Sequence, residues 1–177
     1  MNQILDNYLC EKYPRIFSER SKSPRVSCMG RGFECGNGWM PLIDALCYQI
    51  QTHIDWHNKF DKYHKQKNIP QFVATQVKEK FGLLRIYHEG GDEYCKGLIS
   101  MAGCWSGYIC EMCGIGSNLL VGRTSGYLGS LCKECSKKTK RPIHFDKEIK
   151  TMLTQAIRQD SKKYVQRRDK FIVHCSV

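Results

Sequence analysis

Hydrophobic residues recur at steps of three and four in two stretches of the first third of the chain. From Ile4 to Phe17 this spacing predicts an amphipathic helix, and Pro14 disturbs its end. From Pro41 to about Lys59 the same spacing predicts a second helix, with proline suited to its first turn. The polar and basic residues 18–27 between them predict a loop.

Alternation of hydrophobic and polar positions then predicts two strands, Phe72–Val77 and Leu83–His88. Because successive side chains of a strand point to opposite faces, every second residue shares a face. The residues that share a face are Val73, Thr75 and Val77 in the first strand, and Leu84, Ile86 and His88 in the second. Residues 78–82 are the predicted hairpin connection.

The second half of the chain predicts two more helices and two short strands. Asp92 is a candidate N-cap for a helix running to Trp105, and Asp146 for a long final helix. Short strands are expected at Tyr127–Leu131 and at Phe171–Cys175. The predicted fold class is α+β: a small antiparallel sheet with flanking helices and one four-cysteine zinc-ribbon-like module. We expect an α+β core over 1–109, the zinc module over 110–136, and a basic helical segment over 137–177 that packs on the core.

Four cysteines have the spacing of a metal site. Cys110 and Cys113 are followed, 18 residues on, by Cys132 and Cys135, which gives C-x2-C-x18-C-x2-C. Two residues between cysteines allow a tight turn to aim both thiolates at one ion, and two such turns supply four sulfurs in a tetrahedron. The spacing predicts one structural Zn²⁺ per chain, with no open position for a reacting water.

Other interpretations of these cysteines remain open. Free core thiols, a redox Cys-x-x-Cys pair and an iron–sulfur cluster would each use the same residues. Zinc is favoured because two pairs at this separation are typical of zinc ribbons, and a redox motif needs only one pair. The histidines His53 and His57 could share a helix face as metal ligands do, but the pattern favours surface histidines.

Composition restricts the class of protein. Hydrophobic residues make up 41% and charged residues 25% of 177 residues, which are values of a globular chain. No apolar run approaches the roughly 18 residues of a membrane helix. The first residues do not resemble a secretory leader, and eleven cysteines then indicate a reducing cytosol. We therefore expect a cytoplasmic protein without a membrane partner.

The net charge of +11 points to an anionic partner. Thirteen Lys and Arg against five Asp and Glu between Lys133 and Lys170 place most of that excess after the cysteine pairs. The alternative is a solvated basic face that keeps the chain soluble. Lys78, Lys80 and Arg85 stand near aromatic Phe81 and Tyr87, a combination that suits exposed bases and phosphates. The candidate ligand-binding residues are Arg31, Lys78, Lys80, Arg85, Tyr87, Arg123, Lys137, Lys138, Lys140 and Arg141.

Three motifs carry a resemblance to a known family. They are Gly36-Asn37-Gly38-Trp39, the segment VKEKFGLLRIY over 77–87, and Cys110-Glu111-Met112-Cys113-Gly114. With them the chain resembles an uncharacterised family of small zinc-binding proteins of tailed phages and their bacterial hosts, over roughly residues 8–135. The resemblance implies a phage or prophage accessory protein acting in the cytoplasm of the bacterial host. It does not extend to the basic segment after Cys135.

The leading hypothesis is a non-enzymatic, zinc-stabilised accessory protein that binds nucleic acid or a nucleotide. A second hypothesis is a phage counter-defence protein that inhibits a host immune protein or sequesters a nucleotide immune signal. A third is a zinc-containing nuclease, with His144 as the only nearby candidate base. Phosphodiester hydrolysis normally needs a metal with open coordination positions, and the sequence alone does not assemble one.

Overall fold

The computed structural model describes residues 1–64, 68–116, 121–126 and 128–144, together with Thr151, Gln155 and Arg158. The chain divides into two compact units, Met1–His144 and Phe145–Val177. In the second unit the three described residues are helical, and the rest of the predicted final helix lies outside the described residues. The predicted strand at Phe171–Cys175 also lies outside them, so its existence stays a prediction.

The first helix, α1 (Gln3–Lys12), is shorter than its hydrophobic pattern predicts. It begins after Asn2, whose side chain accepts a hydrogen bond from the Leu5 amide. It ends at Lys12 because the residue before a proline is driven out of the helical conformation, and Tyr13 precedes Pro14. The turns that follow carry Ile16 and Phe17 into the core.

Two long helices pack beside each other. Helix α2 (Met40–His64) follows two short 3₁₀ turns, η1 (Cys28–Arg31) and η2 (Asn37–Trp39). Helix α3 (Glu93–Ser106) begins at the predicted N-cap Asp92, whose carboxylate accepts from the Cys95 amide. The ring of His53 on α2 lies 4.3 Å from that of Tyr94 on α3, which places the second half of α2 against the start of α3.

The predicted hairpin is formed by β1 (Val73–Lys80) and β2 (Leu83–Glu89), paired antiparallel. Its connection is only Phe81-Gly82, so the first strand runs three residues further than predicted. The predicted shared face of β1 is wrong, because a register shift between Ala74 and Gln76 bulges the strand. Ala74 and Val77 are the buried residues of β1 instead.

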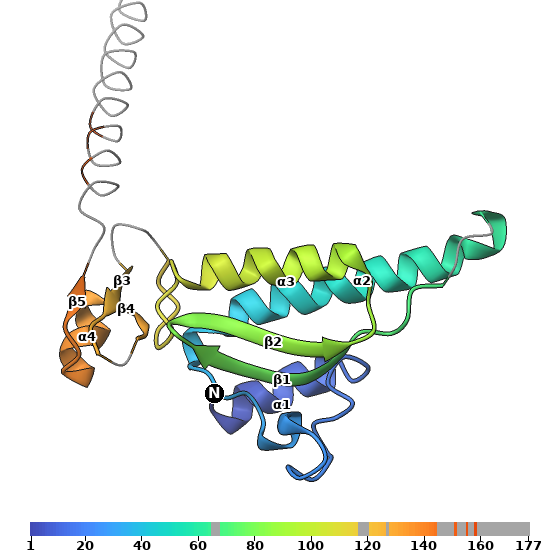
Figure 1. The fold of residues 1–177 in the computed structure, drawn as a ribbon, viewed down its shortest axis with the longest axis horizontal. Coiled ribbons are helices and arrows are strands. Elements are labelled where there is room, and N and C mark those ends of the chain that lie inside the picture. The colour runs from blue at the N-terminus through green and yellow to red at the C-terminus, as the bar shows by residue number, and fades with distance from the viewer. Residues whose placement is uncertain are drawn as a thin grey trace, which may run out of the picture. The chain divides into compact units, whose positions relative to one another are not determined.

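The other edge of β1 is also occupied. Glu34 bridges to Lys78 in parallel, donating its amide to the Val77 carbonyl and accepting from the Glu79 amide at 2.9 Å each. Further along, the Ala74 amide donates to the Ile16 carbonyl. The hairpin is thereby tied to the loop before η2 and to the turns after α1, while α2 and α3 run behind it (Figure 1).

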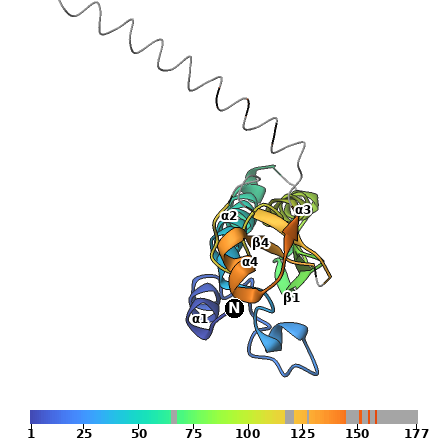
Figure 2. The same ribbon diagram turned by 90° about the vertical axis from the view of Figure 1, so that its left-hand side faces the viewer.

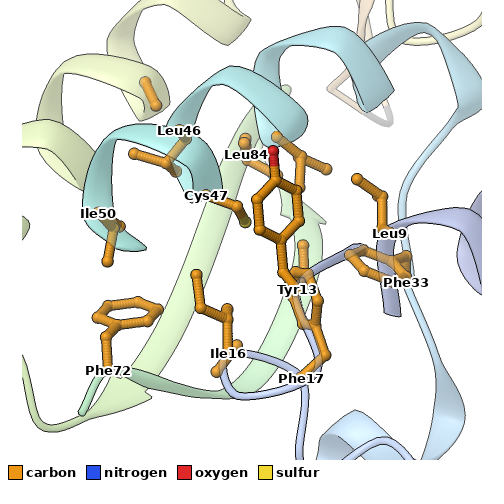
Figure 3. Packing of buried hydrophobic residues seen from close by; sticks show 14 of the residues in the cluster. Leu9, Tyr13, Ile16, Phe17, Phe33, Leu46, Cys47, Ile50, Phe72 and Leu84 are labelled. Carbon is orange, nitrogen blue, oxygen red and sulfur yellow. The ribbon is translucent and has the colours of Figure 1, made fainter. Parts of the chain in front are cut away.

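One hydrophobic core fills the space between these elements. Figure 3 shows side chains from α2, the turns after α1 and the start of β1 pointing toward one another. Among them Ile50, Phe72 and Ile16 are almost fully buried. None of the helices within the described residues is long and apolar enough to cross a membrane.

A second small sheet follows α3, with the strand order β4-β3-β5. It consists of β3 (Val121–Thr124), β4 (Ser130–Cys132) and β5 (Ile143–His144), and helix α4 (Lys133–Thr139) lies between β4 and β5. The strand expected at 127–131 is observed at its C-terminal end only, and Tyr127 lies outside the described residues. In Figure 2 this sheet and α4 face the viewer.

The fold class is the predicted one, α+β with small antiparallel sheets and a cluster of four cysteines. The boundaries expected after residues 109 and 136 both fall inside the first compact unit, whose core and second sheet belong together. The expectation that all of 137–177 packs on the core stays a prediction, because most residues after His144 lie outside the described part.

Candidate metal centre and basic face

The four predicted cysteines meet at one point. The sulfurs of Cys110, Cys113, Cys132 and Cys135 all lie within 4.8 Å of one another. Those of Cys113 and Cys132 are 3.7 Å apart. In a tetrahedral site with metal–sulfur bonds of about 2.3 Å, sulfurs are separated by about 3.8 Å. This four-cysteine centre can therefore hold a single tetrahedral metal ion with little rearrangement.

Each cysteine pair sits in a turn that its sequence explains. After Cys110 the chain reverses through Gly114, which has φ +80° and returns its amide to the Cys110 carbonyl. The second pair begins α4: Cys132 is the N-cap, and its sulfur accepts from the Cys135 amide. The Glu111 amide donates to the Ser130 carbonyl at 2.9 Å, which holds the two turns side by side.

The local electrostatics favour one thiolate before any metal arrives. Burial opposes ionisation of Cys132, but hydrogen bonds from the Cys135 amide and the neighbouring thiols outweigh it and lower its pKa to about 7. Burial raises the pKa of Cys110, and burial together with the Cys132 thiol raises that of Cys135. Three of the four cysteines are buried and Cys113 is exposed, as in a closed site that fixes structure.

The glycine-rich loop before α2 holds this centre against the core. The amide of Gly36 donates to the Glu111 carboxylate at 2.9 Å and the amide of Gly38 to the Glu111 carbonyl at 2.7 Å. The Trp39 indole donates to the Ile109 carbonyl at 3.0 Å. A Cβ at Gly38 would overlap the carbonyl oxygen of Cys110, so only glycine allows this approach.

The tip of the hairpin is the second point of attachment. Phe81 and Gly82 both have positive φ, +56° and +73°, as a two-residue type I′ turn requires. The Arg123 guanidinium on β3 donates to the Phe81 carbonyl at 2.6 Å. The Ser130 hydroxyl on β4 donates to the Gly82 carbonyl at 2.7 Å. Residues of the second sheet therefore fix the backbone that presents Phe81 to solvent.

Four of the predicted ligand-binding residues, Lys78, Lys80, Arg85 and Tyr87, come together on the outer face of the hairpin. Lys78 pairs with Arg85 across the strands, so their side chains leave the same face. The Lys78 ammonium lies 5.1 Å from the centre of the Tyr87 ring, and the Lys80 ammonium 5.4 Å from that of Phe81. Phe81 and Tyr87 are 63% and 45% exposed, which leaves both rings accessible to a ligand.

Arg31 lies at the margin of this face. Its guanidinium is 3.9 Å from the carboxylate of Glu34, the residue that pairs with β1 at Lys78. The same carboxylate accepts a hydrogen bond from the Gln76 side chain at 2.8 Å. The loop and the hairpin thus form one continuous surface, which we call the basic face and define as Arg31, Lys78, Lys80, Phe81, Arg85 and Tyr87.

The remaining predicted cations follow the second cysteine pair. Lys137, Lys138, Lys140 and Arg141 are exposed at and beyond the end of α4. Lys137 pairs with Glu134 at 3.1 Å, and Lys140 adopts the left-handed conformation that ends the helix. Arg123 donates a hydrogen bond to the Phe81 carbonyl at the hairpin tip. If it also binds a ligand, it does so while it holds the tip. His144, the candidate base, is exposed on β5 opposite Arg123.

Sequence patterns did not reveal Glu111 and Ser130, which join the centre to the glycine loop and to the hairpin, respectively. In the sequence Glu111 stands out only as part of the Cys-x-x-Cys pair, and no pattern marks Ser130. Burial raises the pKa of the Glu111 carboxyl, while the Gly36 amide opposes that shift. A glutamate between two metal-binding cysteines, preceded far upstream by Gly-x-Gly-Trp, is the one sequence signal that points here.

No protein-family model, curated protein or solved structure matches this chain. The resemblance to a phage family therefore stays a prediction. The structure does show that its three motifs are not independent, since the glycine–tryptophan loop contacts Glu111 and the KEKFG turn contacts Ser130. Ser130 in turn accepts a hydrogen bond from the Glu111 amide, which brings the three segments together.

Proposed function

We propose that this chain is a non-enzymatic, zinc-stabilised accessory protein of phage type that binds a polyanion, either nucleic acid or a nucleotide. The observation that carries the proposal is the basic face, where three cations and two accessible aromatic rings share one side of a short hairpin. The phage origin rests on the three motifs alone. The bacterial cytoplasm as its site of action rests on the same resemblance and on the number of cysteines.

The arrangement suits exposed bases better than a closed duplex. Aromatic side chains stack on the faces of unpaired bases, and Lys and Arg contact the phosphates between them. The Lys78 ammonium lies close to the Tyr87 ring and the Lys80 ammonium close to the Phe81 ring. A base that stacks on either ring would therefore bring its phosphate near a lysine.

The metal in the four-cysteine centre is proposed to be Zn²⁺. Four thiolates in a tetrahedron favour this ion over harder divalent cations, and its closed coordination makes it a structural element. Quantifying metals in protein purified without added zinc tests the assignment. One zinc retained by the four cysteines supports it, whereas iron with inorganic sulfide at the same place would replace it with a cluster.

Binding is tested by fluorescence anisotropy with labelled single-stranded RNA and DNA, and by competition with free nucleotides. The double variant Lys78→Glu/Arg85→Glu should weaken binding at least tenfold. The matched control is Arg15→Glu. It reverses the charge of an exposed arginine that is paired with Asp55 on α2, outside the basic face. Equal affinities for the double variant and the wild type would reject the basic face as the site.

The salt dependence provides a second measure. Each phosphate contact with a single strand contributes a slope of about −0.7 in a plot of log affinity against log salt concentration. A variant with all four charges of the cluster at the end of α4 reversed tests whether that cluster contacts the ligand. The four residues are Lys137, Lys138, Lys140 and Arg141. A shallower slope with retained binding would show that this cluster adds phosphate contacts to those of the basic face.

A further inference from the structure

A second group of metal-ligand side chains lies away from the four-cysteine centre. The ligand atoms of His53, Asp92 and Cys95 all lie within 4.8 Å of one another. His53 comes from the second half of α2, and the other two come from the start of α3 (Figure 1). Among the described residues these are the only two such groups of three or more His, Cys, Asp or Glu.

Each of the three side chains is held in place by its surroundings. One carboxylate oxygen of Asp92, Oδ1, accepts from the Cys95 amide at 3.0 Å, and the other, Oδ2, lies 2.8 Å from His53 Nε2. The His53 ring packs against Tyr94 with 4.3 Å between centroids. Cys95 is completely buried beneath them. The role of Asp92 as helix cap uses only its Oδ1 atom. It does not explain why Oδ2, the His53 imidazole and the Cys95 thiol also lie together.

We propose that His53, Asp92 and Cys95 bind a second divalent transition-metal ion, with Zn²⁺ favoured by the mixed nitrogen, oxygen and sulfur donors. A carboxylate and a thiolate together neutralise the charge of the ion, and the imidazole binds as a neutral ligand. Tetrahedral nitrogen and oxygen ligands stand about 3.3 Å apart. The 2.8 Å between His53 and Asp92 therefore has to widen by about half an ångström, a movement within the reach of two side chains.

This second site differs from the four-cysteine centre in having an open position. Three protein ligands leave a fourth place for water, and the side chains of His53 and Asp92 are 23% and 34% exposed, so solvent reaches the ion. One turn further along α2, the buried Nδ1 of His57 has no hydrogen-bond partner in the described structure. Its ring centre is 6.1 Å from that of His53, close enough for a metal-bound water to serve as that partner.

The test is metal stoichiometry on the full-length protein after equilibration with Zn²⁺ and removal of unbound ion. We expect two equivalents per chain for the wild type and one for His53→Gln. Asp92→Asn should also bind one equivalent, and because asparagine keeps the cap of α3 the variant should retain its helix content and thermal midpoint. The cysteine is tested by Cys95→Ala against Cys47→Ala, another buried cysteine outside the cluster, which should keep both equivalents.

Replacement by Co²⁺ separates the two sites by spectrum. The four-cysteine centre gives the intense absorption of four thiolate ligands, and the second site should add a weaker thiolate band that disappears in His53→Gln and Cys95→Ala. One equivalent in the wild type, or two equivalents that survive both substitutions, would overturn the proposal. The anisotropy measurements are independent of this result, because none of the three residues belongs to the basic face.

Discussion

The Ser130 hydroxyl donates a 2.7 Å hydrogen bond to the carbonyl oxygen of Gly82, a residue 48 positions earlier in the chain. Two residues after Ser130 stands Cys132, one of the four clustered cysteines, and one residue before Gly82 stands the exposed ring of Phe81. This bond therefore connects the shape of the metal centre to the part of the molecule that we propose meets the ligand. A change at one is expected to be measurable at the other.

Removing the metal should loosen the basic face. Cys113→Ser deletes one of four ligands, and because the binding energy of such a site is folding energy, we expect a lower thermal midpoint and weaker oligonucleotide binding. The matched control is Cys104→Ser, another exposed cysteine that lies outside both metal-ligand groups. Calorimetry and anisotropy on both variants provide the measurement. A Cys113→Ser protein with wild-type affinity would disconnect the metal centre from binding.

Phe81 should oppose stability while supporting binding. A non-glycine residue in the left-handed region costs about 1 kcal/mol, and asparagine tolerates that region better than phenylalanine. Phe81→Asn is expected to raise the thermal midpoint by about 2–4 °C and to weaken oligonucleotide binding by about tenfold. Phe81→Tyr serves as the control that keeps an aromatic ring, and its affinity should stay near that of the wild type.

Because the glycine loop lies so close to the first cysteine pair, two glycine-to-alanine variants should change the unfolding free energy in opposite directions. Gly38→Ala forces a methyl group against the Cys110 carbonyl and the Gly114 amide, and should destabilise the fold by about 1–3 kcal/mol. Gly97→Ala lies inside α3 with no atom within 4 Å of the added carbon, and should stabilise it by about 0.5–1 kcal/mol. Urea unfolding measures both; equal effects of the two substitutions would contradict the proposed close contact.

Buried thiols should make the fold less stable in alkali. Burial raises the pKa of Cys35 to about 12, whereas an unfolded cysteine titrates near 8.5. Below about pH 8.5 both states hold the proton and stability is unaffected. Above it the unfolded chain loses the proton and the folded one does not, so this thiol lowers the unfolding free energy by about 1.4 kcal/mol per pH unit up to about pH 12.

Cys35→Ala isolates that contribution. Urea unfolding between pH 8 and 10 should show a smaller decline with pH for this variant than for the wild type. The matched control is Cys28→Ala, at an exposed cysteine of the same loop. Parallel curves for the wild type and Cys35→Ala would mean that the thiol ionises as readily in the folded protein as in the unfolded one.

Periodicity and spacing were sufficient for the local features. The cap at Asp92 and the meeting of the four cysteines follow from rules that act over a few residues or over a known ligand spacing. The alternation over Leu84 to His88 likewise predicted which side chains of β2 face inward. The bulge in β1 was not predictable, because the shift between Ala74 and Gln76 is marked by no glycine or proline and depends on how β1 pairs with β2.

Contacts between residues far apart in the chain could not be predicted from the sequence. Nothing near Glu34 marks it as a neighbour of Lys78, and His53 and Asp92 are 39 positions apart on elements whose packing had to be known first. Helix periodicity places His53 at the edge of the buried stripe, which predicts a surface residue. The carboxylate and thiol beside His53 are brought there by the packing of α2 against α3, which no local sequence pattern predicts.

The contact between Gly36 and Glu111 also fixes the order of events during synthesis. Glu111 leaves the ribosome 75 residues after Gly36, which at common elongation rates is a delay of about 4–15 s. Until then the amides of Gly36 and Gly38 lack their Glu111 acceptors, and the nascent chain can pack together only the elements up to α3. The last of the four cysteines, Cys135, emerges later still, so a metal ion can complete the four-cysteine centre only after that stage. Chains whose four cysteines bind no ion are therefore expected to accumulate at that stage, where they are substrates for proteases.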